Sequence, residues 1–164
     1  MKKFFLFIIF CLSQLTNAQF LVEDAVEDEF FSENGKSMFS ANLNFPFEYF
    51  RILNCTENQI SYAKPVNGDE AVKRELFNYM QAYLDKDAYA LNGTFYFVFD
   101  IDAQGNVSGF ELRPNVVNSN MLSEDMKFIV KRLKEKWYPA NCGGAPIPSK
   151  MRMKVNFRTE FFDL

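Results

Sequence analysis

The chain contains no histidine. Histidine supplies the base in Ser-His-Asp and Cys-His catalysis and two ligands of the HExxH zinc site, so its absence excludes these kinds of site. Carboxylates alone can still serve as acid and base, as they do in glycoside hydrolysis. The formal net charge is −3. An acidic chain is a poor match for nucleic acid, because nucleic acids are bound by basic surfaces.

Long apolar runs are also scarce, and the one such run lies at the N-terminus, over residues 4–12. Lys2 and Lys3 precede it, and small residues follow up to Ala18. This pattern is typical of a cleavable secretory signal peptide and is too short for a membrane anchor. Retention, or lipidation at Cys11, is the alternative. The sequence therefore predicts a periplasmic or secreted protein, cleaved near Ala18, with no membrane span after cleavage.

Cysteine is scarce too: after cleavage only Cys55 and Cys142 remain. In an oxidising compartment such a pair more often forms one disulfide than a metal site. The bond would stabilise the fold by roughly 4 kcal/mol on the chain-entropy model, because it closes a long loop. A reactive thiol is the alternative, but it needs an activating base that the sequence does not identify. No metal or cofactor is predicted.

Secondary-structure patterns become clear only from Asp69 onward, where apolar residues recur with the spacing of helices or alternate as in strands. The predicted elements are a helix at 69–85, a strand at 93–102, a strand at 107–113, a helix at 123–137 and a strand at 150–158. The first strand carries apolar groups on both faces near its middle, which favours a central position in a sheet.

The order of these elements predicts an α+β fold, with two helices packed on a three-stranded antiparallel sheet. The first two strands form a hairpin, and a right-handed helical crossover then places the last strand beside the first, giving the strand order 2-1-3. The last strand becomes an edge, and its outward cations are typical of edges. The predicted organisation is a signal peptide at 1–18, a partly irregular N-terminal extension at 19–68 and one domain at 69–164.

The segment between the second helix and the last strand combines several restrictive residues: Trp137, Pro139, Ala140, Gly144 and Pro146. Each has a structural use in ending a helix or shaping a turn. Together with the preceding hairpin turn, from Asp100 to Val107, they resemble the C-terminal domain of TonB-like proteins over about residues 69–158.

The resemblance implies a periplasmic module that grips an extended peptide of an outer-membrane receptor by pairing with it along the last strand. The predicted partner-binding residues are therefore Lys150, Arg152, Lys154, Val155, Asn156 and Arg158. The uncleaved anchor and long proline-rich linker of the energy transducers are not recognised in this sequence. We therefore expect a free-standing relative that does not transmit force from the inner membrane.

The predicted function is an exported, non-enzymatic module that binds a protein or extended peptide. A structural envelope protein, or a homodimer formed by pairing of two edge strands, is the alternative. The segment from Asp100 to Glu111 partly matches a calcium loop, but the strand that precedes it argues against the required flanking helix. Asp100 and Asp102 could also serve as the carboxylate pair of a hydrolase, although a solvated turn explains them better.

Overall fold

The computed structural model describes residues 29–31, 37–117 and 119–161, so the predicted signal peptide lies outside the described residues. The two α-helices are α2 (Asp69–Tyr83) and α3 (Ser119–Val130). Short 3₁₀ helices span Glu57–Gln59 and Lys86–Ala88. The strands are β1 (Glu29–Phe31), β2 (Ser37–Asn42), β3 (Phe47–Tyr49), β4 (Ile60–Ser61), β5 (Lys64–Pro65), β6 (Gly93–Ile101), β7 (Val107–Arg113), β8 (Trp137–Tyr138), β9 (Ala140–Cys142), β10 (Ala145–Ile147) and β11 (Ser149–Phe161).

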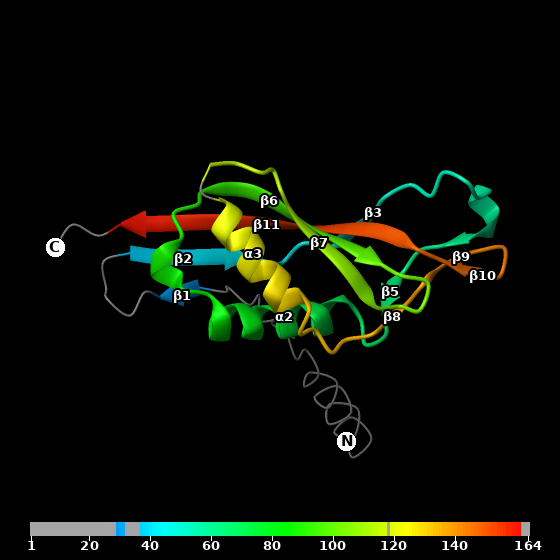
Figure 1. Ribbon diagram of the computed structural model, residues 1–164, viewed down its shortest axis with the longest axis horizontal. Helices are drawn as coiled ribbons and strands as arrows, with labels where there is room; N and C mark the ends of the chain where they lie inside the picture. The colour runs from blue at the N-terminus through cyan, green and yellow to red at the C-terminus, as the bar shows by residue number, and fades with distance from the viewer. Residues whose placement is uncertain (1–28, 32–36, 118, 162–164) are drawn as a thin grey trace, which may run out of the picture.

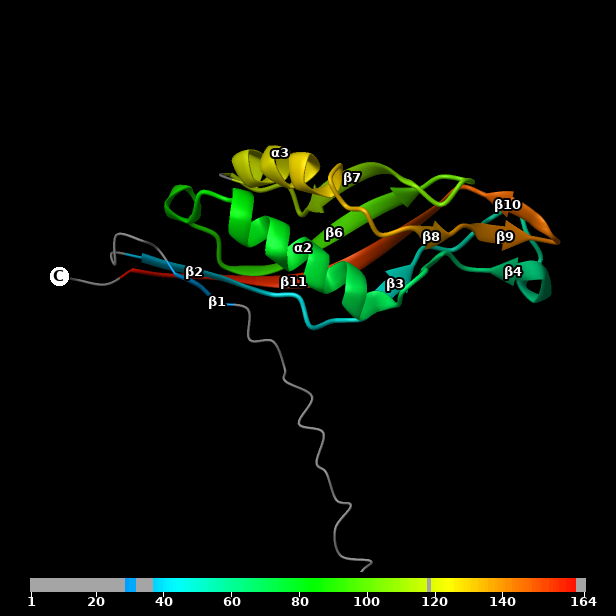
Figure 2. The ribbon, with the colours of Figure 1, turned by 90° about the horizontal axis from the view of Figure 1, so that it is seen from below.

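One antiparallel sheet dominates the molecule, with the strand order β1-β2-β11-β6-β7 and with β3 also paired to β11. Two small sheets, β10-β9-β4 and β5-β8, extend it at one end (Figure 1). Both helices pack on one face of the large sheet, as the two perpendicular views show (Figure 2). Within the described ranges, no helix covers the opposite face.

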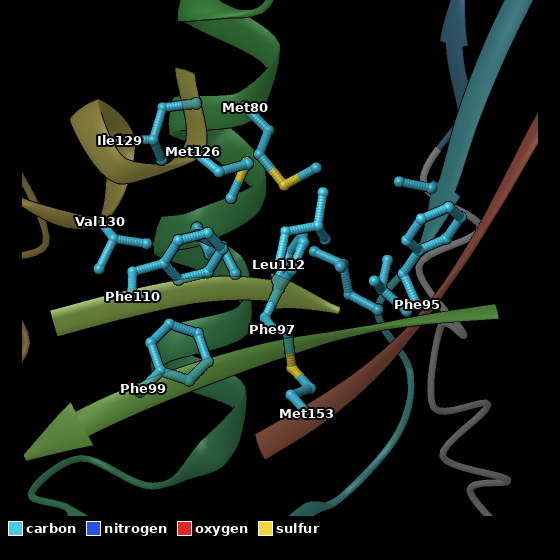
Figure 3. Close-up of a cluster of buried hydrophobic side chains, with 14 of the residues drawn as sticks. Met80, Phe95, Phe97, Phe99, Phe110, Leu112, Met126, Ile129, Val130 and Met153 are labelled. Atoms are coloured by element: carbon cyan, nitrogen blue, oxygen red, sulfur yellow. The ribbon is translucent and has the colours of Figure 1, made fainter. Parts of the chain in front are cut away.

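The core lies between this sheet and the helices. Figure 3 shows Met80 of α2 and Met126 of α3 above Phe97 of β6, and all three side chains have 0% exposure. Phe110 of β7 packs edge-on against Phe97, with ring centroids 5.4 Å apart. The alternating apolar residues of β6 and β11 thus serve one continuous core, as their periodicity predicts.

The predicted helix at 69–85 and the predicted hairpin strands are confirmed, with bounds that differ by at most two residues. The hairpin turn is closed by Asp102, whose carboxylate accepts hydrogen bonds from the backbone N–H groups of Gln104 and Asn106. The first helix begins after Gly68, which has a φ of 87° and occupies the N-cap position.

The second helix was predicted at 123–137, and this range is wrong. Its start at Ser119 is fixed by that side chain, whose hydroxyl accepts from the N–H of Val116. Beyond Val130 the carboxylate of Glu75 accepts the N–H groups of Lys134 and Glu135 and draws this segment out of the helical path. A contact from a distant helix therefore overrides the local apolar spacing.

The predicted three-stranded sheet is also wrong. The neighbours β7-β6-β11 occur as expected, but β2 and β3, from the predicted extension, pair with the other side of β11. In β2 and just after it, Phe39, Ala41 and Leu43 alternate inward and are buried, which extends the core beneath these strands. The last strand is therefore an interior strand.

Candidate functional site

The residues predicted to bind a partner lie on β11, but not at a free edge. Val155 points into the core with 0% exposure, so it cannot contact a partner. The N–H of Phe50 donates to the carbonyl of Lys150 at 3.1 Å, so the backbone groups of the even-numbered β11 residues point toward β2 and β3. Those strands leave only a short gap, opposite Lys154 and Val155.

The other five predicted side chains lie on the face opposite the helices and are largely engaged. Their partners are Asp100 for Lys150 at 2.6 Å, Glu48 for Arg152 at 2.6 Å, Glu160 for Arg158 at 2.5 Å, Thr94 for Asn156 at 2.9 Å and the Phe45 ring for Lys154 at 4.5 Å. Acids on neighbouring strands, together with Glu160 of β11 itself, therefore balance most of the cationic row, so the row attracts an acidic partner only weakly.

The far edge of the sheet, β7, is free of a second strand within the described residues, but it is short. The backbone groups of Phe99 on β6 point toward Met151 of β11, because odd-numbered residues of β11 face β6. Phe110 of β7 lies opposite Phe99, so the backbone N–H and C=O of Phe110 point away from β6, toward the free edge. Leu112 does the same. A register irregularity at the start of β7 and Pro114 just after it limit the free donors and acceptors to about these two residues.

The edge of the small sheet formed by β10 is closed to strand addition by proline. A two-residue turn at Gly143 and Gly144, with φ values of 59° and 94°, joins β9 to β10. Cys142 and Ala145, which flank this turn, are paired with each other, so the backbone of the next residue, Pro146, points away from β9. Because backbone direction alternates along a strand, the same orientation is expected at Pro148. Neither carries an N–H, so this edge offers only acceptors.

An open cleft of about 900 Å³ lies at the same end of the molecule. One wall is formed by residues 50–55 and the other by Cys142, Ala145 and residues 147–150, with Asp100, Ile101 and Ser108 also lining the cleft. Its apolar lining comes from Phe50, Ile52, Leu53, Ala145, Ile147 and Pro148. Leu53 is 83% exposed. A concave, mainly apolar surface with a few polar groups is the usual form of a binding site.

The predicted disulfide between Cys55 and Cys142 is confirmed, and it joins the two walls of this cleft. Both cysteines line the cleft and are partly exposed. Their Cα atoms are 5.9 Å apart. Below the bond, Ile60 of β4 pairs with Cys142 of β9, so the first wall is attached again where the small sheet begins.

Charges beside the cleft are paired. The ammonium of Lys150 lies 2.6 Å from Asp100 and 3.5 Å from Glu111. The hydrogen bond with Asp100 raises the pKa of Lys150, and hydrogen bonding from Arg113 lowers the pKa of Glu111. Both groups are therefore ionised at neutral pH and are unsuited to proton transfer there. The buried hydroxyl of Ser149, in contrast, has no hydrogen-bond partner within the described residues.

The carboxylates considered for catalysis or calcium serve other contacts. The pKa of Asp102 is lowered, first by the backbone N–H of Asn106, so this carboxylate stays ionised in its turn. Asp100 holds Lys150, and Glu111 is bonded to Arg113. Within the described ranges, no group of three or more His, Cys, Asp or Glu side chains is placed to hold a metal ion.

The restrictive residues after α3 shape the second wall. Trp137 is buried and meets the Phe47 ring edge-on at 5.4 Å, while its backbone N–H donates to the carbonyl of Gly105 at 3.1 Å. The buried Ala140, which follows Pro139, begins β9. Gly144 and Pro146 form the turn and edge described above. These residues position the strands that carry the wall.

Comparisons with protein-family models, with curated proteins and with solved structures found no match. The likeness to TonB C-terminal domains therefore rests on the sequence pattern given above. Among the described residues, no helix is long and apolar enough to cross a membrane.

Sequence reasoning missed the first wall of the cleft. Phe50 and Leu53 lie in a stretch of turn residues without periodicity, so no pattern marks them as neighbours of Ile147. The cysteine pair was the one available signal, because a bond from Cys55 to Cys142 must bring these segments together.

Proposed function

We propose that the protein is an exported, non-enzymatic binding module of TonB C-terminal type that holds an extended segment of a protein partner in the cleft beside the disulfide. The observation that carries this proposal is the cleft itself, about 900 Å³ in volume and open to solvent. Exposed apolar surface in a concavity favours a ligand that supplies apolar side chains. Among the large hydrophobic side chains that line the cleft, Leu53 is the most exposed.

The polar groups in the cleft suit a peptide. Asp100, Ser108 and Lys150 line the cleft beside its apolar surface, and a peptide backbone carries both donors and acceptors that can meet such groups. The carbonyl of Pro148, which lines the cleft, can accept from an N–H, but proline offers no N–H in return, so one or two bonds are favoured over a full strand ladder. A partner segment is therefore held mainly by its side chains.

Other chemistry is less well supported. The chain has no histidine, and the acids nearest the cleft are bound to Lys150 or Arg113. A homodimer paired through β11 requires a free edge on that strand, which β2 and β3 occupy over most of its length. Binding at the cleft needs neither a catalytic base nor a free edge.

The test uses the mature chain, residues 19–164, and peptides selected from a displayed random library. We expect enrichment of apolar extended sequences whose affinity falls by about tenfold or more on Leu53→Asp, since a charge would be placed in the apolar wall. Val117→Asp is the matched control, because Val117 is 86% exposed but lies just before α3 and does not line the cleft. Failure to enrich any peptide, or equal losses in both variants, would contradict the proposal.

A further inference from the structure

The first wall of the cleft has almost no core of its own. Between residues 50 and 62 no side chain is fully buried. Ile52 packs partly against the edge of the main core, and Leu53 projects into solvent. The ion pair of Arg51 and Glu57 is 3.8 Å long with both side chains more than three-quarters exposed, so it adds little. Burial therefore does not fix the position of this wall.

Backbone contacts fix only the ends of the wall. At one end the N–H of Phe50 bonds to Lys150. At the other, Ile60 and Ser61 pair with β9, and the carbonyl of Gln59 accepts from Gly143. Between Phe50 and Gln59, the covalent bond from Cys55 is the main attachment to the opposite wall. Segments with few buried contacts open locally at low free-energy cost.

We propose that the Cys55–Cys142 disulfide is a redox-sensitive clamp that keeps the cleft in its binding shape. Both sulfur-bearing residues are partly exposed and line the open cleft, so a dithiol can reach the bond. Its thiolate attacks one sulfur, and the mixed disulfide is then resolved by its second thiol. The dithiol becomes a disulfide, and Cys55 and Cys142 each gain one hydrogen. The wall is then free to move away.

The inference rests on the proposed function for its effect on a ligand, but not for its effect on the wall. Amide hydrogen exchange of the wall is measured without ligand, in the oxidised chain and in the Cys55→Ser, Cys142→Ser double variant. We expect exchange of the hydrogen-bonded amides that hold the wall, those of Phe50, Gln59 and Gly143, to rise by about tenfold or more, while amides of β6 stay protected. Protection of β6 shows that the variant is folded.

Two further arms separate the possible results. A dithiol should reproduce the exchange change in the wild type and have no effect on the double variant. Peptides selected on the oxidised chain should bind about tenfold more weakly after reduction. Unchanged exchange of the Phe50, Gln59 and Gly143 amides after reduction would overturn the clamp, whatever the peptides do. If the oxidised chain selects no peptide, the proposed function fails, and the exchange result still decides the clamp.

Discussion

The two ends of the large sheet are held together by different forces. At the helix-covered end, Phe97, Met80 and Met126 are fully buried in one core. At the cleft end, residues 50–62 bury no side chain fully, and a disulfide links them to β9. The first end should resist local opening as part of the whole fold, whereas the second should respond to the redox state. Binding surfaces are commonly found on such weakly packed segments.

The largest expected effect comes from the core. Phe97→Ala should lower the free energy of unfolding by about 3–5 kcal/mol, because it removes a fully buried ring and leaves a cavity. Leu53→Ala, at the exposed wall, should change it by less than about 0.5 kcal/mol. Urea denaturation of both variants measures the contrast. Similar losses would show that the two ends do not differ as described.

Loss of the disulfide should have the next largest effect on the free energy of unfolding, and this effect acts through the unfolded chain. Replacing Cys55 and Cys142 by serine should cost about 2–4 kcal/mol, since it releases a constraint on the unfolded chain that spans a separation of 87 residues. The slope of unfolding free energy against urea should rise, because the unfolded chain becomes more expanded. A loss of stability with an unchanged slope would place the effect in the folded state instead.

A smaller contrast compares two glycines in turns. A Cβ at Gly105 would lie 1.9 Å from the carbonyl oxygen of Trp137, whereas one at Gly144 would meet nothing within 4 Å. Both have positive φ. Gly144→Ala should therefore cost about 1 kcal/mol of unfolding free energy for backbone strain alone, and Gly105→Ala about 2–3 kcal/mol. Equal thermal unfolding midpoints in the two variants would argue against the close contact at Trp137.

The smallest effect is a pH dependence in the hairpin turn. Hydrogen bonds from Asn106 and Gln104 hold the pKa of Asp102 below 3.8 in the folded state. The carboxylate therefore stabilises the turn above the unfolded pKa, and this contribution is lost as the pH falls through the folded pKa. The amide resonance of Asn106 should titrate with Asp102 and should lose this titration in Asp102→Asn. A carboxyl pKa at or above 3.8 would contradict the assignment.

The sequence predicts the parts of the fold that carry their own periodicity. The alternation in β6, β7 and β11 is set by burial of one sheet face, so it can be read directly. It could not show that β11 is interior, because β2 and β3 are short and pair with residues far along the chain. The early end of α3 depends on Glu75, which lies on another helix. Contacts of this kind leave no local pattern.

The candidate site also divides into parts that a local sequence pattern predicts and parts that depend on contacts between distant residues. The row from Lys150 to Arg158 was correctly placed on one strand, but its edge position depended on what residues 37–49 do. The cleft is assembled from a patternless segment, the turn after β9 and the start of β11. Only the pairing of Cys55 with Cys142 could be foreseen, and it marks the cleft more directly than the charged row does.

The central claim is that a partner segment binds in the cleft and not along β11. Chemical-shift mapping tests it most directly, by adding a selected peptide to the isotope-labelled mature chain. We predict the largest shifts at residues 50–55 and 145–150, with β2 and residues 156–161 of β11 unchanged. Shifts centred on β2 and on residues 156–161, with loss of their pairing, would contradict the account, because the peptide would then have displaced β2 to reach the strand edge.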